Sequence, residues 1–404
     1  MLKRYFSRLP LTDRITFSVE LQTAALYGIH AGLALPLIPI MARKLGLGAE
    51  GIAVMLTMQF VGAVFGVFIG HLADRLPKMP LVVWPLAFAR GIVILLAFVR
   101  GPAGFFIVAS LFYFGSNLGG PAFASIMRSN YSDANRGRLM GVLRIEAMAI
   151  AAVCSTLASL FLESEAVLYL LFPISGVSGV VSILIFARIK VRRIPGLPRK
   201  SAPVTFRTSM AVVGKNAGFI IFMWILMLCA GPEKLTLPIE PIRFVDELGI
   251  DYRQTTFILG TVVSVFSIIG YYLWARALRR MSPFAIMAIV TLLGAARTAV
   301  IAAATNILHL VPASAFLGLI NAGWDLAPLF CIITLADPEN FALYFGFHTT
   351  LVGIRGVAGP AIGTILFSTG AMSAPAIFWM VSAFTAAGGI ALMRFSRRLK
   401  RGLF

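Results

Sequence analysis

Acidic and basic residues interrupt long apolar stretches of this chain, at places where a charge inside a membrane would be costly. A charge at the centre of the hydrocarbon costs on the order of 2.5–3.5 kcal/mol even on the insertion scale. Such side chains therefore face a polar cavity or pair with one another, and the chemistry open to them is ligand binding or proton transfer. The acids are Glu20, Glu146, Glu233, Glu240 and Asp325, and the bases are Arg90, Arg144, Lys234, Arg297 and Arg355.

Three of these acids, Glu146, Glu233 and Asp325, are candidate proton carriers. A buried carboxyl group holds its proton more tightly than an exposed one, and a nearby cation has the opposite effect, so a change of environment can load and unload a proton. Asp325 and Arg355 both lie near the middle of their apolar runs. We therefore expect these two residues to form a functional pair.

Two further arginines have a structural interpretation. Arg90 and Arg297 occupy similar places in the two halves of the chain, each directly after an alanine. We expect both to be held by structural partners. Glu20 and Arg144 lie near the ends of their apolar runs, which favours a position at the membrane interface.

The elements that must position these charges are membrane helices. Of the 404 residues, 59% are apolar and 13% are charged, and the mean hydropathy is +0.90. A soluble fold cannot hide that much apolar surface, and disordered chains are far more polar. Continuous runs of about 20 apolar residues favour helices over a transmembrane barrel. The predicted spans are 17–41, 50–72, 80–99, 103–127, 139–161, 166–188, 217–239, 254–277, 283–304, 308–335, 341–367 and 372–393.

The basic residues are distributed asymmetrically along these twelve spans. Of the 35 Lys and Arg, 25 fall in segments on the side of the N-terminus, five fall in the opposite loops and five fall within spans. Cytoplasmic loops carry such an excess, so we expect both termini to be cytoplasmic, in a plasma membrane such as the bacterial inner membrane. The net charge of +19 then indicates topology and attraction to anionic membrane lipids, and we expect no nucleic-acid partner.

The two halves of the chain resemble each other. Residues 33–40 (LALPLIPI) correspond to residues 235–242 (LTLPIEPI), and Asn117-x-Gly119 corresponds to Asn321-x-Gly323. Six helices per half is an even number, so both halves enter the membrane from the same side as a parallel repeat, with the substrate between them. The predicted domains are an N-terminal six-helix bundle (1–188), a cytoplasmic linker (189–216) and a C-terminal six-helix bundle (217–404).

Twelve spans, a parallel repeat and a basic central loop resemble the major facilitator superfamily over nearly the whole chain. The most specific local element is GHLADRLPK at residues 70–78. It is similar to the family's signature Gly-x-x-x-Asp-Arg-x-Gly-Arg-Arg/Lys, with a proline at the second glycine. The resemblance implies a conformational latch formed by Gly70, Asp74, Arg75 and Lys78.

The resemblance also implies which helices line a central cavity. These are the first, fourth, seventh and tenth spans, with the second, fifth, eighth and eleventh beside them. Proton-driven drug antiporters of the family usually carry an arginine in the fourth span and a Gly-Pro-x-x-Gly-Gly run in the fifth. This sequence has neither. The predicted substrate-binding and coupling residues are His30, Asn117, Glu146, Glu233, Lys234, Asn321, Trp324, Asp325 and Arg355.

Together these patterns predict a secondary active transporter. It would move a small solute by alternating access, as a monomeric symporter or antiporter coupled to protons or another ion, without a cofactor. The phosphate-binding pattern Gly-x-x-x-x-Gly-Lys-Ser/Thr is missing, which argues against ATP as the energy source. The alternatives are a lipid flippase of the same fold, a membrane receptor or scaffold that transports nothing, and a lipid-modifying membrane enzyme. An enzyme would need a nucleophile–base set or a metal cluster, and the four histidines are scattered.

Overall fold

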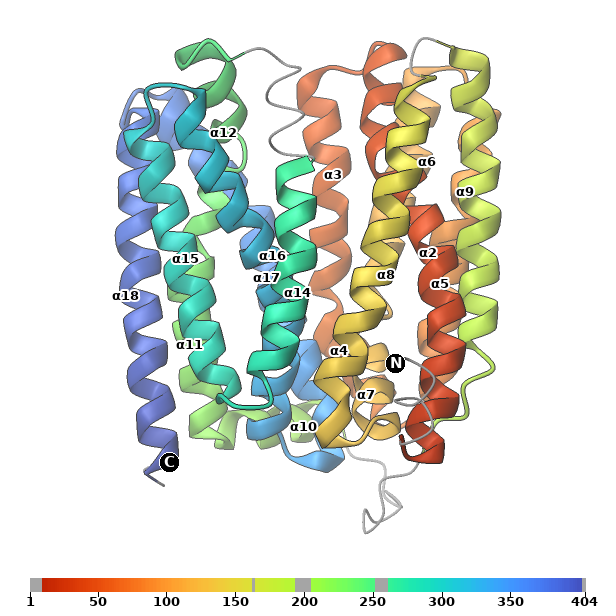
Figure 1. The fold of residues 1–404 in the computed structure, drawn as a ribbon, viewed down its shortest axis with the longest axis vertical. Helices are drawn as coiled ribbons and strands as arrows, with labels where there is room; N and C mark the ends of the chain where they lie inside the picture. Colours follow the sequence, from red (N-terminus) through yellow and green to blue (C-terminus); the bar gives the residue numbers. More distant parts are fainter. Residues whose placement is uncertain (1–8, 162–163, 193–204, 251–260, 402–404) are drawn as a thin grey trace. The chain divides into compact units, whose positions relative to one another are not determined.

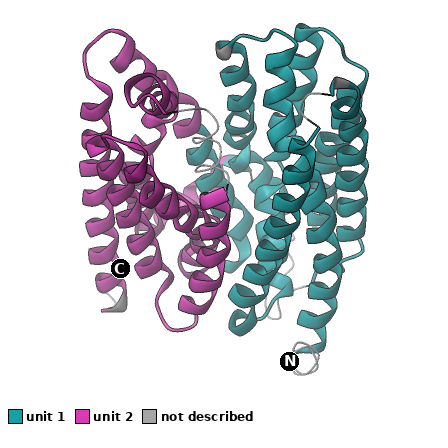
Figure 2. Cartoon of the chain, turned by 45° about the horizontal axis from the view of Figure 1, so that its top comes forward, with its two compact units in different colours: residues 1–206, 337–353 teal, residues 207–336, 354–404 magenta. Residues whose placement is uncertain are grey.

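Helices form the described part of the chain, which in this computed structural model comprises residues 9–161, 164–192, 205–250 and 261–401 (Figure 1). Two compact units can be distinguished, one of residues 1–206 with 337–353 and the other of residues 207–336 with 354–404 (Figure 2). We refer to them as unit 1 and unit 2 and describe each by itself.

Up to residue 206 the helices are α2 (Leu11–Lys44), α3 (Ala49–Val64), α4 (Gly66–Ala73), α5 (Lys78–Ile92), the 3₁₀-helix η1 (Val93–Ala97), α6 (Pro102–Ser116), α7 (Gly120–Asn130), α8 (Asp133–Ser159) and α9 (Glu165–Phe186). The later helices are α10 (Phe206–Lys215), α11 (Ala217–Ala230), the 3₁₀-helix η2 (Pro232–Thr236), α12 (Ile239–Ile242), the π-helix η3 (Arg243–Glu247), α14 (Val263–Ala277), α15 (Pro283–Ala303), α16 (Ile307–Leu335), the 3₁₀-helix η5 (Pro338–Asn340), α17 (Phe341–Ser368) and α18 (Ala374–Lys400).

The described residues contain eleven helical segments that are long and apolar enough to cross a membrane. They confirm the predicted all-helical membrane architecture and correspond to eleven of the twelve predicted spans. The remaining one, 254–277, begins outside the described residues, and α14 covers its second part. Helix ends differ from the predicted ends by a few residues, because several helices continue into polar turns beyond the apolar run.

One helix interruption coincides with a Gly-Gly-Pro sequence. The predicted span 103–127 is divided into α6 and α7 around Asn117, directly before the sequence Gly119-Gly120-Pro121. Glycine weakens a helix, and Pro121 has no N–H to donate to the carbonyl of Asn117, which accepts from the N–H of Gly120 (3.5 Å) in a tighter turn instead. The corresponding helix of the second half, α16, runs through unbroken, since Trp324 and Asp325 stand where the first half has Gly120 and Pro121.

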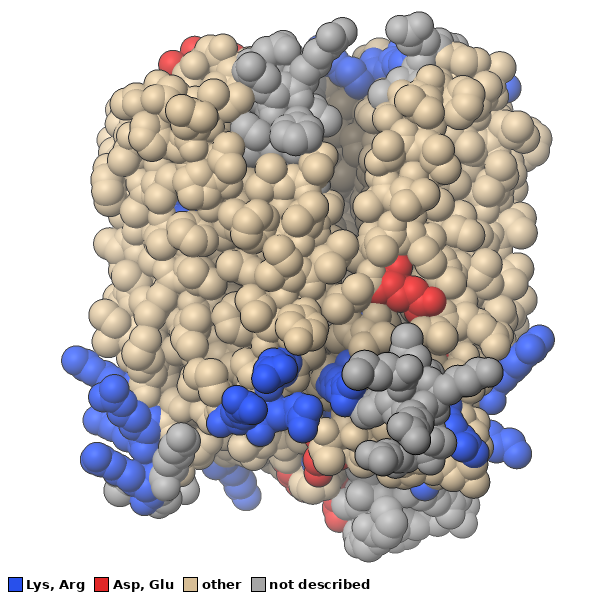
Figure 3. Space-filling view, in the orientation of Figure 1, with Lys and Arg blue, Asp and Glu red and all other residues tan. Residues whose placement is uncertain are grey.

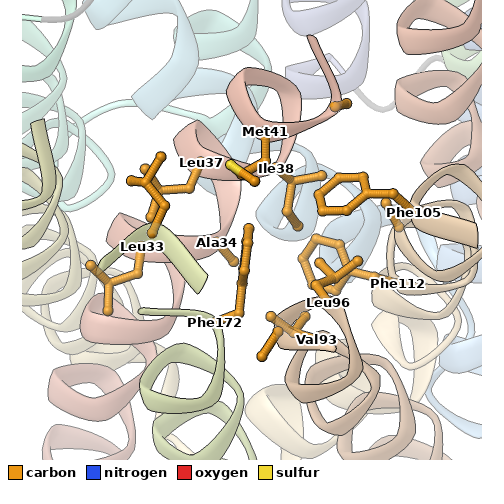
Figure 4. Close-up of a cluster of buried hydrophobic side chains, with 14 of the residues drawn as sticks. Leu33, Ala34, Leu37, Ile38, Met41, Val93, Leu96, Phe105, Phe112 and Phe172 are labelled. Atoms are coloured by element: carbon orange, nitrogen blue, oxygen red, sulfur yellow. The ribbon is translucent and has the colours of Figure 1, made fainter. Parts of the chain in front are cut away.

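The helices of unit 1 pack around α2 and α5. Helix α2 contacts α8 and α9, α5 contacts α6 and α9, and α3 contacts α6. A cluster of buried apolar side chains joins α2 to η1, α6 and α9. It includes Leu37, Ile38, Leu96, Phe105 and Phe172 (Figure 4).

The helices of unit 2 pair in the same order. Helix α18 contacts α11 and α15, and α16 contacts α14 and α15. These four pairs correspond to α2–α9, α5–α9, α3–α6 and α5–α6 of unit 1, which is the pattern that an internal duplication predicts. Lys and Arg gather at the end of unit 2 where the α14–α15 turn and the C-terminal end of α18 lie (Figure 3). They include Arg276, Arg279, Arg280, Arg394, Arg397 and Arg398.

Candidate functional site

The residues predicted as a latch lie against the first turn of α17. The carboxylate of Asp74 accepts a hydrogen bond from the backbone N–H of Ala342 (3.1 Å) and one from that of Leu343 (2.8 Å). The first N–H groups of a helix have no partner within the helix, and they carry its positive dipole end. Asp74 therefore caps α17 with a negative charge. Arg75, which follows Asp74, and Lys78, the first residue of α5, are half-buried.

Glycines allow α17 to approach α4 closely. A Cβ atom on Gly70 would lie 2.2 Å from the carbonyl oxygen of Ala342, and one on Gly346 would lie 2.2 Å from that of Gly66. The hydroxyl of Thr350 donates to the carbonyl of Val64 (2.8 Å) and accepts from the backbone N–H of Val67 (2.9 Å). A side chain of α17 thus supplies hydrogen bonds at the interruption between α3 and α4.

A second group of predicted residues meets in unit 2. The guanidinium carbon of Arg355, on α17, lies 5.3 Å from the centre of the Trp324 ring, on α16. Glu233 and Lys234 lie in η2, and the charge of Glu233 acts on both Lys234 and Arg355. Arg355 is 7% exposed, and its Nε has no hydrogen-bond partner among the described residues. Two cations, a carboxylate and an indole ring thus form one cluster.

Close packing between η2 and α17 assembles this cluster. A Cβ atom on Gly359 would lie 2.4 Å from the Cβ of Lys234, and one on Gly363 would lie 2.1 Å from the carbonyl oxygen of Leu235. These are the glycines of the Gly-Pro-Ala-Ile-Gly run in α17. Side chains at both positions would push η2 and its charges away from Arg355.

The predicted pair of Asp325 and Arg355 is not formed. Within the described part of the chain, Arg355 has no carboxylate at ion-pair distance, and Asp325 accepts a hydrogen bond from the hydroxyl of Tyr271 on α14 (3.1 Å). The helix geometry explains the difference, because successive residues point about 100° apart. Trp324 faces Arg355, so its neighbour Asp325 faces α14. Asp325 and Asn321 are both exposed.

The predicted residues of unit 1 do not converge. Nδ1 of His30, which is buried, lies 3.0 Å from the carbonyl oxygen of Ser175 on α9. The side-chain amide of Asn117 donates to the carbonyl of Gln59 on α3 (3.1 Å). Glu146 is half-buried, and its buried Oε2 has no hydrogen-bond partner in the part of the chain that the structure describes. Each of the three is thus in a different surrounding.

The two arginines predicted to have structural partners differ from each other. Arg297 forms a buried ion pair with Glu240. Arg90 donates to the carbonyl of Gly179 (3.3 Å) and the hydroxyl of Ser182 (2.5 Å), and its guanidinium carbon lies 4.8 Å from the centre of the Tyr27 ring. All of these partners of Arg90 are uncharged.

Sequence reasoning missed a pocket within unit 1. It encloses about 910 Å³ of space, its open mouth included, and its walls come from α2, α5, α6, α7, α8 and α9. In the sequence, the pocket is indicated only by charged residues within apolar runs. The sequence does not indicate that the charged side chains of α2, α5 and α8 lie at the same pocket. The charged and phenolic side chains in the wall are Glu20, Tyr27, Arg90 and Arg144.

Comparisons with known proteins give one family and one fold. The sequence profile of the Major Facilitator Superfamily matches residues 23–233. Among solved structures, the E. coli fucose:proton symporter FucP is similar with a TM-score of 0.72 and 15% identity, over 95% of this chain and 99% of that one. The human organic anion transporter MFSD10 is similar with a TM-score of 0.70 and 14% identity, over 95% of this chain and 100% of that one. None of the curated proteins compared with the chain matches it.

Proposed function

The chain belongs to the Major Facilitator Superfamily, and from this premise we propose that it moves a small solute across the membrane by alternating access, driven by a proton or other ion gradient. It is an integral membrane transporter rather than an enzyme. One observation carries the mechanism. The same continuous helix, α17, is capped by Asp74 at its first turn and bears Arg355 in the charged cluster.

The distance along α17 fits a mechanical link between the two places. From Ala342 to Arg355 the helix rises by about 20 Å, at about 1.5 Å per residue. A continuous helix transmits a tilt or a rotation over that distance. A solute that attracts or displaces Arg355 would therefore move α17 and strain the hydrogen bonds between its first turn and Asp74. Breaking those hydrogen bonds would in turn allow α17 to move and change the surroundings of Arg355.

We assign the solute to the cluster of unit 2. Lys234 and Arg355 would hold an electronegative group, and Trp324 would stack on the solute from the side. Glu233 and Asp325 are the proposed proton carriers of unit 2. In unit 1 the proposed coupling residues are His30, Asn117 and Glu146, and Asn321 joins Asp325 on the exposed side of α16. The proposed latch is Gly70, Asp74, Arg75 and Lys78.

Transport in proteoliposomes tests these assignments. The purified protein would be given radiolabelled sugars, amino acids and organic acids, each with and without an imposed pH gradient. Arg355→Gln and Asp325→Asn should each abolish the uptake seen with the unchanged protein, and Arg276→Gln, at an exposed arginine in the last turn of α14, should not. Full uptake by both variants would overturn the proposed site. Uptake that ignores the pH gradient would remove proton coupling and leave facilitated diffusion. Flipping of fluorescent lipids without solute uptake would favour the flippase alternative.

We further propose that both termini are cytoplasmic, that the membrane is a plasma membrane such as the bacterial inner membrane, and that the protein acts as a monomer. The excess of Lys and Arg in the segments on the N-terminal side supports this orientation. A reporter fused to the C-terminus that is active only in the cytoplasm should be active. Activity of a periplasm-specific reporter at that end would contradict the orientation.

A further inference from the structure

Arg90 is a cation without a matching anion. Its counterpart in the second half, Arg297, is neutralised by Glu240. Arg90 has only uncharged hydrogen-bond partners and the Tyr27 ring, and no carboxylate lies within ion-pair distance of it among the described residues. Holding a charge at this depth without a counter-charge is costly, and such a residue in a membrane span indicates a ligand site.

Arg90 borders the pocket of unit 1, where it meets a second cation and one acid. Arg144, on α8, lines the same pocket and acts electrostatically on Glu20, on α2. The Glu20 carboxylate accepts a hydrogen bond from the hydroxyl of Tyr131. Burial and the charge of Glu20 raise the pKa of Tyr131, so its hydroxyl keeps the proton that it donates. Two guanidinium groups against one occupied carboxylate leave the pocket with a net positive charge.

The interruption of the fourth span adds to this positive potential. Gly119 and Gly120, at the start of α7, line the pocket. Helix α7 has eleven residues, and the N–H groups of Gly120 and Phe123 donate to the carbonyls of Asn117 (3.5 Å) and Gly119 (3.0 Å) in the preceding turn, so the start of α7 contributes its positive dipole end rather than free donors. In transporters, half-helices whose N-terminal ends face a cavity hold the anionic group of the substrate. In this chain that helix end and the two arginines border one cavity.

Apart from the hydroxyls of Thr23 and Ser116, the rest of the pocket wall is apolar. Phe123 and Phe186 lie there with their ring centres 5.4 Å apart, next to methionine and leucine side chains of α7 and α8. Small-molecule sites combine apolar walls with a few polar groups, and this pocket has the same composition. Such a wall favours a ligand with an apolar or aromatic body over a small inorganic ion.

We propose that the pocket of unit 1 is a binding site for an organic anion with an apolar body. Arg90 and Arg144 bind its carboxylate or phosphate near the start of α7, and the body packs against Phe123 and Phe186. A soluble organic acid and an anionic lipid share this chemistry. The site is separate from the cluster around Arg355, and the inference concerns binding alone.

Equilibrium binding to the purified, full-length protein in detergent tests the site. The probe is radiolabelled 4-phenylbutyrate, with 4-phenylbutanol and 4-phenylbutylamine as competitors of the same shape and different charge. We expect 4-phenylbutyrate to bind and the amine not to compete. Displacement by a short-chain phosphatidylglycerol would identify a lipid as the occupant, and failure to displace would identify a soluble acid. Both outcomes support an anion site.

Two variants locate the binding. Arg144→Gln should weaken the binding of 4-phenylbutyrate about 10- to 100-fold, the usual effect of losing a charge-assisted hydrogen bond. Arg138→Gln is the matched control, since it removes the same charge from an exposed position of the same helix. Gly120→Leu fills the pocket without a backbone clash, because a Cβ there would have no heavy atom within 4 Å. It should also weaken binding at least about tenfold with no loss of folding.

The inference is overturned if the amine binds as tightly as the carboxylate. It is also overturned if Arg144→Gln and Gly120→Leu both leave the dissociation constant unchanged. Binding of 4-phenylbutyrate by a protein that transports nothing in proteoliposomes would refute the proposed function and leave this site intact. The two proposals therefore fail separately.

Discussion

Removal of the Asp74 carboxylate should loosen the first turn of α17. In Asp74→Ala the backbone N–H groups of Ala342 and Leu343 lose their acceptors, and the helix loses the negative charge at its positive end. In Asp74→Asn the side chain keeps one carbonyl oxygen and its shape, so only the charge and one of the two acceptors are lost. The effect of the asparagine should therefore be smaller than that of the alanine.

The magnitude follows from the two contributions of the cap. Loss of a capping side chain costs about 0.5–2 kcal/mol, and loss of a charge at a helix end costs about 0.3–1 kcal/mol. The sum of roughly 1–3 kcal/mol corresponds to about a 5- to 150-fold change in the equilibrium between the capped and the open first turn. Amide hydrogen exchange measures this opening equilibrium directly and requires no knowledge of the transported solute.

The assay is hydrogen exchange followed by mass spectrometry on a peptide that contains residues 341–346. Exchange of this peptide should be about 5- to 150-fold faster in Asp74→Ala than in the unchanged protein, and the acceleration should be smaller in Asp74→Asn. Asp133→Ala is the control, because it removes another acid, 89% exposed, which pairs with Arg136. Unchanged exchange of residues 341–346 in Asp74→Ala, or equal acceleration in Asp133→Ala, would refute the cap.

Two more predictions concern stability in detergent. Gly70→Ala places a Cβ 2.2 Å from a carbonyl oxygen of α17 and should lower the free energy of unfolding by about 1–3 kcal/mol, whereas Gly48→Ala meets nothing within 4 Å and should stay within about 0.5 kcal/mol. Denaturant titration gives the free energy of unfolding of both variants, and equal values would contradict the close contact between Gly70 and α17. Glu240→Gln leaves Arg297 buried without its carboxylate and should cost about 3–5 kcal/mol. Glu247→Gln breaks a more exposed ion pair and should lower the free energy of unfolding by less than about 1 kcal/mol. Thermal unfolding measures both variants, and a larger loss of stability in Glu247→Gln than in Glu240→Gln would contradict the importance of the buried pair.

The helical spans could be predicted because the signal is local. A run of about 20 apolar residues must satisfy its backbone hydrogen bonds within itself when it lies in lipid, so hydropathy alone locates it. The predicted helix ends were less accurate, because hydropathy locates only the apolar part of each helix. Helix α2 starts at Leu11 rather than at residue 17, and α8 starts at Asp133 rather than at residue 139. The first turns of both helices carry polar residues that form a helix outside the apolar run.

Part of the candidate site could also be predicted from the sequence. Gly70 and Asp74 could be selected from a short pattern, since they are four residues apart at the end of α4. Their contact with Ala342 could not, because it joins residues 268 positions apart and depends on how α17 packs against α4. The charges in apolar runs were found one by one, yet the sequence does not say which of them meet.

Sequence by itself determined the class of protein, the places of the spans and the asymmetry of the basic residues, since each of these is a property of consecutive residues. Only the tertiary structure decided the partners. It placed Arg355 on Trp324 instead of Asp325, because neighbouring residues of α16 face different helices. It neutralised Arg297 and left Arg90 without a carboxylate beside a pocket. Partner choice depends on the direction of each side chain and the approach of distant helices, and neither is encoded in spacing along the chain.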